Sequence, residues 1–171
     1  FINGKLSKEN VGQIQDVSGI VVFIYSQIDS QILDMLPQLK FIATMSTGVD
    51  HIDLERCKAR NIFVSNIPSY GENTVAEHAF ALILAISRRL FESFERVRKG
   101  EFSPEGLTGF DLKGKTIGVI GVGNIGKHVV RMAKGFEMDV IAYKRTADPK
   151  LAEELGFSFV DLDTLLLRSD I

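Results

Sequence analysis

The chain has 171 residues, of which 45% are hydrophobic and 25% are charged. That length allows one domain or two small ones, and that composition excludes disordered, collagen-like and low-complexity classes. Lys and Arg number 20 and Asp and Glu number 22, which leaves a net charge of −2. Such a balance gives no general attraction to nucleic acid or to an anionic membrane, so we expect neither as a partner.

The single cysteine, Cys57, has no partner for an internal disulfide, and no pair of cysteines exists that would hold zinc. We therefore predict no metal site and a reducing, cytoplasmic location. The longest apolar run, residues 79–86, is too short to span a membrane, and no secretory leader is visible. Because the chain starts without Met and stops where a new strand is expected to begin, we expect it to be part of a longer protein.

Strand-like and helical patterns alternate along the chain. Short apolar, β-branched runs predict strands at 19–25, 40–45 and 61–65, with helical segments at 32–39 and 54–60 between them. A second series predicts strands at 115–120, 139–143 and 157–160 and helices at 124–135, 150–155 and 162–167. Apolar strands that alternate with helices predict an α/β fold with parallel sheets covered on both faces.

The strongest helical pattern lies between the two series and starts at Thr74. Thr74 and Glu77 have the spacing of a capping box. Because residues 79–86 are apolar on every side, we expect this helix to be buried on more than one face, between domains or subunits. The following segment, 98–115, contains four glycines and a proline, and composition alone would place the domain linker there.

The clearest chemical signal is the run Gly121, Gly123 and Gly126, spaced G-x-G-x-x-G between a predicted strand and an amphipathic helix. In that context Gly121 allows a tight turn, Gly123 lets the backbone approach a pyrophosphate, and Gly126 allows close packing of helix on strand. The free amides and positive dipole end of the helix, at Asn124 and Ile125, then face the phosphates. The pattern predicts a dinucleotide-binding turn; the alternative is a glycine-rich turn that binds nothing.

The end of the next predicted strand bears on which dinucleotide is bound. An acidic residue normally accepts there from the ribose 2′-hydroxyl, whereas this chain has Lys144 and Arg145. Two cations suit a 2′-phosphate, so we expect NADP to bind at least as tightly as NAD. The alternative is that both are solvated surface charges. Asp148 lies beyond the strand and is expected to be solvated.

A second candidate site follows another predicted strand, at Ser46, Thr47 and Gly48. Successive amides in such a turn can bind a carboxylate. On the sequence alone a plain turn, with Asp50 as the cap of the next helix, is the better interpretation. Three histidines lack metal-ligand spacing, and we interpret them as structural or solvated; they are His51, His78 and His128.

Several of these blocks occur together in one known family. The blocks STGVDHID at 46–53, NIPSY at 66–70, TVAEH at 74–78 and GVGNIG at 121–126 follow one another at the expected distances. With them the chain resembles the D-isomer-specific 2-hydroxyacid dehydrogenases, most closely the D-lactate dehydrogenase branch, from about residue 17 to the end. The resemblance implies two Rossmann-like or flavodoxin-like parallel-sheet domains, both incomplete in this chain. Residues 1–71 would belong to a substrate domain and residues 72–171 to the first half of a dinucleotide-binding domain.

The same resemblance implies an oxidoreductase that transfers hydride between NAD or NADP and a small 2-oxo or D-2-hydroxy acid, with pyruvate and D-lactate as one such pair. Four residues would border the substrate: Ser46, Thr47, Gly48 and Tyr70. Eight would bind the cofactor: Thr74, Gly121, Gly123, Asn124, Ile125, Gly126, Lys144 and Arg145. The helix from Thr74 would form a twofold homodimer interface. The family's catalytic Arg, Glu and His are expected beyond Ile171, so we expect the chain as it stands to be inactive.

Two other functions stay open. One is a corepressor-type protein that senses a dinucleotide on the same scaffold, although nothing in the sequence marks a peptide-docking groove. The other is a different Rossmann enzyme, such as a methyltransferase, in which an acidic residue usually stands two positions before the glycine loop; this chain has Val119 there. Cofactor preference is not inherited from the family, because many NAD-dependent members are acidic where this chain has Lys144.

Overall fold

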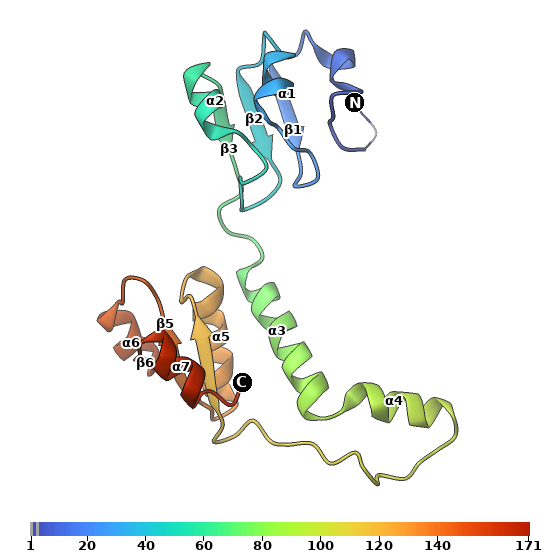
Figure 1. Ribbon diagram of the computed structural model, residues 1–171, viewed down its shortest axis with the longest axis vertical. Helices are drawn as coiled ribbons and strands as arrows, with labels where there is room; N and C mark the ends of the chain where they lie inside the picture. Colours follow the sequence, from blue (N-terminus) through green and yellow to red (C-terminus); the bar gives the residue numbers. More distant parts are fainter. Residues whose placement is uncertain (1, 3) are drawn as a thin grey trace. The chain divides into compact units, whose positions relative to one another are not determined.

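A computed structural model of the chain describes residues 2 and 4–171, which divide into two compact units, Phe1–Tyr70 and Gly71–Ile171. Each unit is built on its own three-stranded parallel sheet, with strand order β1-β2-β3 in the first and β4-β5-β6 in the second (Figure 1). The predicted α/β fold with two parallel sheets is confirmed. Among the described residues, none of the helices combines the length and apolarity that a membrane crossing needs.

The first unit places short helices around its sheet. Its elements are a 3-10 helix at Val11–Ile14, β1 at Gly19–Val22, α1 at Ser30–Asp34, β2 at Phe41–Thr44, α2 at Leu54–Ala59 and β3 at Phe63–Ser65. Strands β1 and β3 flank β2 in parallel. The core is aliphatic, and its least exposed large side chains are Val11, Ile28, Ile32, Leu33, Leu36 and Ile42.

Two elements of this unit are shorter than predicted. β1 ends at Val22 because the chain then turns, with the amide of Ser26 donating to the carbonyl oxygen of Phe23 at 3.0 Å. α1 ends at Asp34 instead of continuing to residue 39, since Pro37 has no amide to donate within a helix.

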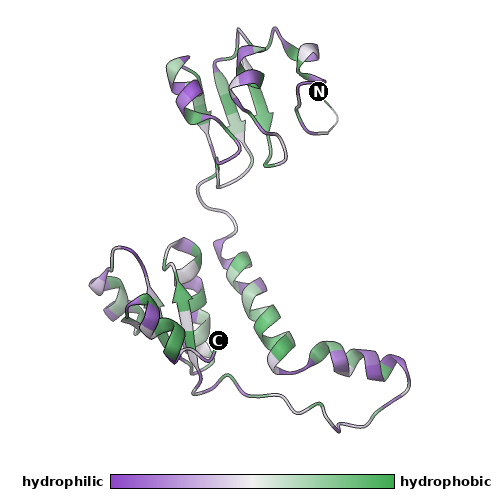
Figure 2. Ribbon diagram, viewed as in Figure 1, coloured by the Kyte–Doolittle hydropathy of each residue, from purple (hydrophilic) through white to green (hydrophobic). Residues whose placement is uncertain are grey.

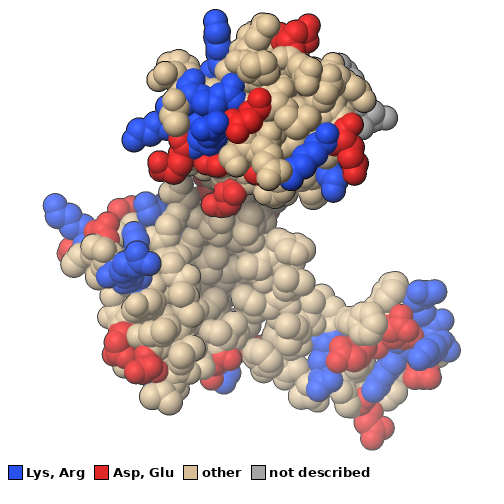
Figure 3. Space-filling model, turned by 45° about the horizontal axis from the view of Figure 1, so that its top comes forward, with Lys and Arg blue, Asp and Glu red and all other residues tan. Residues whose placement is uncertain are grey.

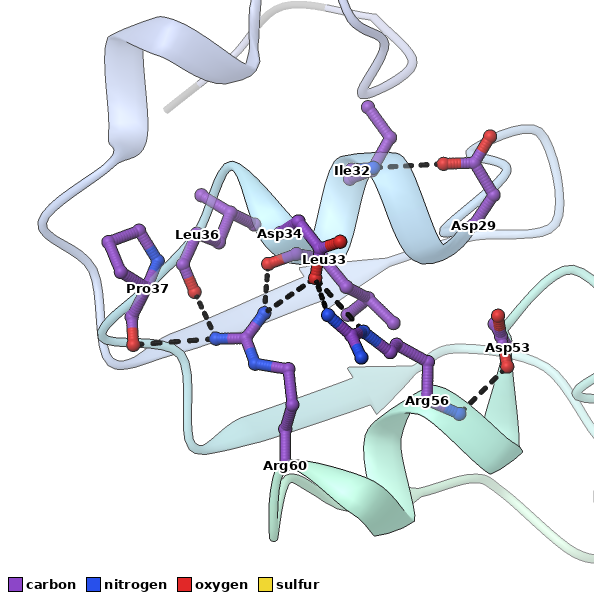
Figure 4. Close-up of polar contacts among 9 residues, drawn as sticks. All are labelled: Asp29, Ile32, Leu33, Asp34, Leu36, Pro37, Asp53, Arg56 and Arg60. Carbon is purple, nitrogen blue, oxygen red and sulfur yellow. Dashed lines mark hydrogen bonds and ion pairs between the residues drawn. The ribbon is translucent and has the colours of Figure 1, made fainter.

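Two arginines of the α2 segment fix the end of α1 (Figure 4). Arg60 donates to the carbonyl oxygens of Leu33 and Leu36, the second at 2.8 Å. The Nη2 atom of Arg56 lies 2.6 Å from Oδ1 of Asp34. The carbonyl oxygens of Leu33 and Leu36 also accept backbone amides, so the Arg60 bonds add to the backbone bonds at the end of α1. The ion pair of Arg56 with Asp34 joins α2 to α1 as well.

The second unit is a longer alternation of helices and strands. Its elements are α3 at Glu72–Ser87, α4 at Leu90–Arg98, β4 at Thr116–Ile120, α5 at Asn124–Gly135, β5 at Asp139–Tyr143, α6 at Pro149–Leu155, β6 at Ser158–Phe159 and α7 at Leu162–Arg168. α3 packs beside α5, where the rings of Phe80 and Phe136 stack with centroids 5.3 Å apart. α7 packs on β4 because Gly118 leaves room for it: a Cβ there would lie 2.8 Å from Cδ2 of Leu165.

The end of the chain returns to β4. Successive residues of a strand direct their backbone groups to opposite edges of that strand. The odd-numbered Gly121, directly after β4, bonds toward β5: its amide nitrogen lies 2.8 Å from the carbonyl oxygen of Tyr143. On the even-numbered positions, the carbonyl oxygen of Thr116 accepts from Asp170 and the amide of Gly118 donates to Ile171, each at 2.9 Å. The order of the chain across the sheet therefore reverses at β4, a point where open α/β sheets bind ligands.

The helix predicted from Thr74 begins two residues earlier, at Glu72, and the predicted capping box is wrong. Gly71 is the N-cap and provides no side-chain cap. The carboxylate of Glu77 accepts from the side-chain amide of Asn73 at 3.2 Å instead of reaching back to Thr74. The first helical bond already runs from the Val75 amide to the Gly71 carbonyl oxygen at 3.0 Å, so the helix begins before Thr74.

α4 was not separated from α3 by the sequence patterns. Arg89 breaks the helix, since its φ of 49° lies in the left-handed region. The segment 98–115 then runs back to the end of α3, where Phe110 donates its amide to the Ser87 carbonyl oxygen at 2.9 Å. This segment therefore lies within the second unit, and the linker inferred there from composition is wrong.

α3 and α4 leave apolar side chains uncovered. α3 is apolar over most of its length (Figure 2), yet only part of it faces the core of its own unit. Seven large apolar side chains from 52% to 73% exposed lie on the two helices: Val75, Leu82, Ile86, Leu90, Phe91, Phe94 and Val97. Charged side chains elsewhere mix both signs on the face shown in Figure 3, so that face presents no broad patch of one sign.

Candidate functional site

The glycine-rich turn joins β4 to α5. Gly121 has a φ of 91°, which an L side chain rarely adopts, and its amide is bonded to the end of β5. Gly123 is the N-cap of α5, and its carbonyl oxygen accepts the first helical bond from Lys127 at 3.1 Å. The turn is thus held at the carboxyl end of β4, where the chain order reverses.

Two glycines of this turn differ in the room around them. A Cβ on Gly126 would overlap the carbonyl oxygen of Gly121 and lie 3.6 Å from Cγ1 of Val119, so only glycine lets α5 approach the turn this closely. A Cβ on Gly123 would meet no heavy atom within 4 Å. Packing among the described residues therefore does not require glycine at residue 123. The missing side chain instead leaves the backbone there open to a ligand.

The start of α5 differs from every other α-helix that residues 4–171 form. Asp side chains cap α1, α2, α6 and α7, and α3 and α4 each have a Glu in the first turn. α5 has neither a side-chain cap nor an acidic residue in its first turn. The first amides of a helix point along its axis and lack helical partners, and the dipole makes this end positive. A helix start of this kind binds phosphate groups.

Other predicted cofactor residues lie at the same end of the sheet. Asn124 and Ile125 are exposed in the first turn of α5, and Lys144 and Arg145 are exposed directly after β5. β5 ends beside the turn, as the bond from Gly121 shows. Asp148 is exposed, as predicted, and its carboxylate also caps α6 by accepting from the Leu151 amide at 3.2 Å.

Thr74 is exposed in the first turns of α3. α3 and α5 run side by side and begin at the same end of the unit (Figure 1). The helix packing therefore places Thr74 toward the end of the unit that carries the glycine turn, without a hydrogen bond that joins the two in the described part of the chain.

The second candidate turn, Ser46–Gly48, lies at the carboxyl end of β2 in the first unit. Its three carbonyl oxygens all have donors: Ser46 accepts from the Ile67 amide at 3.1 Å, Thr47 from the side-chain amide of Asn66 at 2.8 Å, and Gly48 from the Ser46 hydroxyl at 2.8 Å. Within residues 2 and 4–171, the exposed amides of Thr47 and Gly48 have no acceptor. Backbone turns that bind anions share this arrangement of paired carbonyls and unpaired amides.

Two predictions near this turn have different outcomes. Asp50 does not cap the next helix; Asp53 does, accepting from the Arg56 amide at 2.8 Å. His51, interpreted from the sequence as structural or solvated, is structural: it is buried, with Nε2 lying 3.1 Å from the Thr44 hydroxyl. Asp53 takes the cap because it immediately precedes the first residue of α2, while Asp50 lies in the turn before it.

Tyr70 ends the first unit with 62% of its surface exposed, and no described contact brings it to the Ser46–Gly48 turn. Asn66, which no sequence pattern marked as a site residue, links the end of β3 to this turn. Asn66 directly follows a predicted strand that is parallel to β2. Because the carboxyl ends of parallel strands meet at one edge of a sheet, this position could have indicated that Asn66 lies near the turn.

The remaining titratable groups offer no competing site. Burial raises the pKa of the Cys57 thiol, so this cysteine is not poised as a nucleophile. Of the other histidines, His78 is exposed on α3 and His128 half-buried on α5. No group of three or more potential metal-binding His, Cys, Asp or Glu side chains occurs among the described residues.

Comparison with known proteins agrees with the glycine turn. The family model for the NAD binding domain of D-isomer specific 2-hydroxyacid dehydrogenases matches residues 80–171. The chain belongs to this family. The matched region includes the whole β4–α5 turn and both cations after β5.

Individual dehydrogenases of this family show the same extent of similarity. A 2-hydroxyacid dehydrogenase homolog from Zymomonas mobilis is 38% identical over 100% of this chain and 53% of its own length. The glyoxylate reductase of Thermococcus litoralis is 39% identical over 92% of this chain and 50% of its own. The D-lactate dehydrogenase from Aquifex aeolicus, whose crystal structure is complexed with NAD and lactic acid, superposes with a TM-score of 0.89 at 38% identity, covering 97% of this chain and 50% of that one. The chain spans about half the length of the relatives it matches.

Proposed function

We propose that this chain supplies the dinucleotide-binding turn and the substrate-carboxylate turn of an oxidoreductase that interconverts a small 2-oxo acid and a D-2-hydroxy acid. The observation that carries the proposal is the start of α5, which lacks both a side-chain cap and an acidic first turn, within a region that matches an NAD-binding family. Its residues fit a dinucleotide, because Gly123 leaves open space where a phosphate would approach.

Each turn has a separate task in this proposal. The first amides of α5 bind the pyrophosphate, and Thr74, Asn124 and Ile125 complete the surface around it. The amides of the Ser46–Gly48 turn bind and orient the substrate carboxylate, with Tyr70 at the border of the substrate site. The bound nicotinamide supplies or takes up the hydride. The domain roles, a substrate domain over 1–71 and a dinucleotide-binding domain over 72–171, are part of the same proposal.

The two cations after β5 are the basis for a proposed preference between NAD and NADP. Exposed Lys144 and Arg145 stand where a carboxylate would otherwise accept from a ribose hydroxyl. A 2′-phosphate gains charge-assisted hydrogen bonds from such a pair, so NADP binds at least as tightly as NAD.

The apolar surface of α3 and α4 is proposed to bind a second copy of the chain. Uncovered side chains such as Ile86 and Phe91, each 73% exposed, form the kind of surface that a twofold interface buries on both subunits. The substrate branch stays a prediction as well, since the named relatives include both glyoxylate reductase and D-lactate dehydrogenase.

The test uses the whole gene product with NADH and NADPH and a panel of 2-oxo acids from glyoxylate and pyruvate to bulkier side chains. The expected result is oxidation of at least one reduced nucleotide with at least one acid. Tight nucleotide binding without turnover on any acid would favour a dinucleotide-sensing protein instead. No binding of either nucleotide would refute the proposed role of α5.

A further inference from the structure

A buried chain of polar side chains lies behind the Ser46–Gly48 turn. The side chains belong to Thr44, Ser46 and His51, which are 2%, 3% and 7% exposed. Nε2 of His51 lies 3.1 Å from Oγ1 of Thr44, and Oγ1 of Thr44 lies 2.7 Å from Oγ of Ser46. Oγ of Ser46 in turn lies 2.8 Å from the Gly48 carbonyl oxygen. Polar groups at this depth are retained at a cost unless they are bonded to one another.

The number of available protons fixes which group donates in each of these three hydrogen bonds. A carbonyl oxygen only accepts, so the single hydroxyl proton of Ser46 is donated to Gly48. Thr44 must then donate its own proton to Ser46, which leaves the Thr44 oxygen as the acceptor from His51. His51 therefore holds a proton on Nε2, and the chain runs from imidazole to hydroxyl to hydroxyl to carbonyl.

The backbone holds His51 in place for this role. The Ile28 amide donates to the His51 carbonyl oxygen at 2.7 Å, and the Asp53 amide donates to the Ile28 carbonyl oxygen at 2.9 Å. The two bonds form a parallel bridge between Ile28 and Ile52. Because Ile28 is fully buried, the segment that carries the imidazole is anchored in the core, while Thr47 and Gly48 of the turn are exposed.

We propose that His51, acting through Thr44, is a positioning residue for the carboxylate-binding turn. His51 and Thr44 keep the Ser46 hydroxyl donating to the Gly48 carbonyl oxygen, so that this oxygen at the end of the turn has a hydrogen-bond partner. The Thr47 and Gly48 amides then stay available to an anion. This inference rests on the proposed function of the turn. Its effect belongs to substrate binding, because none of the three side chains is exposed enough to reach reacting atoms.

The first experiment compares four variants of the whole protein. His51→Leu and Thr44→Val each remove a link, whereas His51→Gln and Thr44→Ser keep a donor or hydroxyl at about the same position. The two removals are expected to raise KM for the 2-oxo acid roughly 10- to 100-fold, because that factor corresponds to the loss of one well-aligned hydrogen bond to a charged group. We expect kcat and KM for the nucleotide to stay within about threefold of wild type on the same reasoning. The two conservative variants restore KM for the acid.

Thr44→Val also protects the test against a failure to fold, since valine has nearly the shape of threonine and suits a strand. An unchanged KM in both removal variants would overturn the proposal. Parallel losses in kcat, both KM values and thermal stability, without rescue by Gln or Ser, would show a merely structural role and would overturn it as well.

The second experiment needs no activity. Nitrogen chemical shifts of the His51 ring in the wild-type protein are expected to show a protonated Nε2 with slow exchange of its proton, and Thr44→Val is expected to speed that exchange. An Nε2 that carries no proton would refute the direction of the bonds. If these signals are as expected and no 2-oxo acid is a substrate, the proposed function of the turn has failed while the hydrogen-bond chain stands.

Discussion

Replacing Gly126 or Gly123 by alanine separates packing from ligand binding in the glycine turn. A Cβ at residue 126 overlaps the Gly121 carbonyl oxygen and lies 3.2 Å from the Gly121 carbonyl carbon. Both are backbone atoms, so relief requires the start of α5 to move. Overpacking of this kind costs about 1–3 kcal/mol. For a unit of this size that lowers Tm by roughly 5–20 °C.

Gly123→Ala is the matched control, since its Cβ meets nothing within 4 Å. We expect its free energy of unfolding to change by less than about 1 kcal/mol. Its affinity for either dinucleotide should fall roughly 10- to 100-fold, because the new methyl group displaces a phosphate that bonds to backbone amides. Thermal unfolding without ligand and fluorescence titration with NADH and NADPH measure the two effects. Wild-type affinity in Gly123→Ala, or a wild-type Tm in Gly126→Ala, would refute the reasoning for that residue.

Three further predictions concern charge and association. The double variant Lys144→Ala/Arg145→Ala should weaken NADPH binding roughly tenfold or more and leave NADH within about threefold, because only the 2′-phosphate loses charge-assisted bonds; equal losses in titrations of both nucleotides would contradict this. Ile86→Glu should shift the protein toward monomer in light scattering after gel filtration, while Leu167→Glu, at an even more exposed apolar position on α7 (86% against 73%), should not; unchanged mass in Ile86→Glu argues against the interface. Hydrogen bonds from the Thr164 hydroxyl and amide lower the pKa of Asp161, so its contribution to stability is complete above the unfolded value of about 3.9 and is lost as pH falls through the lower folded value. Urea unfolding of Asp161→Asn should therefore show a flatter loss of stability below about pH 4 than wild type, and identical pH profiles would exclude the effect.

The sequence predicted the layout of the sheets because apolar runs of strand length are set by local composition. β5 and α5 were placed at their observed bounds, and the glycine turn followed from its position between them. The errors arise where one residue decides the backbone. Pro37 ends α1 early, Gly71 starts α3 early, and Arg89 breaks the long helix in a left-handed conformation that no hydrophobic pattern reveals.

The site was predictable to different depths in the two units. The glycine turn is contiguous in sequence, so its spacing was sufficient to propose it. The side chain of Asn66 bonds to the Ser46–Gly48 turn, and that of His51 bonds to Thr44 just before it; both contacts form only after the strands pair and the chain turns back. On sequence alone the turn was therefore interpreted as an ordinary turn, and His51 as structural or solvated.

The open start of α5 has a consequence for the life of the protein in a cell. The first amides of this helix gain hydrogen-bond partners when a ligand binds. Part of the free energy of unfolding therefore depends on the concentration of that ligand. A ligand at 100 times its Kd adds about 2.7 kcal/mol to the folded state. Proteases that cleave transiently open forms would then degrade the protein fastest when the proposed dinucleotide is scarce, and the protein's abundance would follow the supply of that ligand.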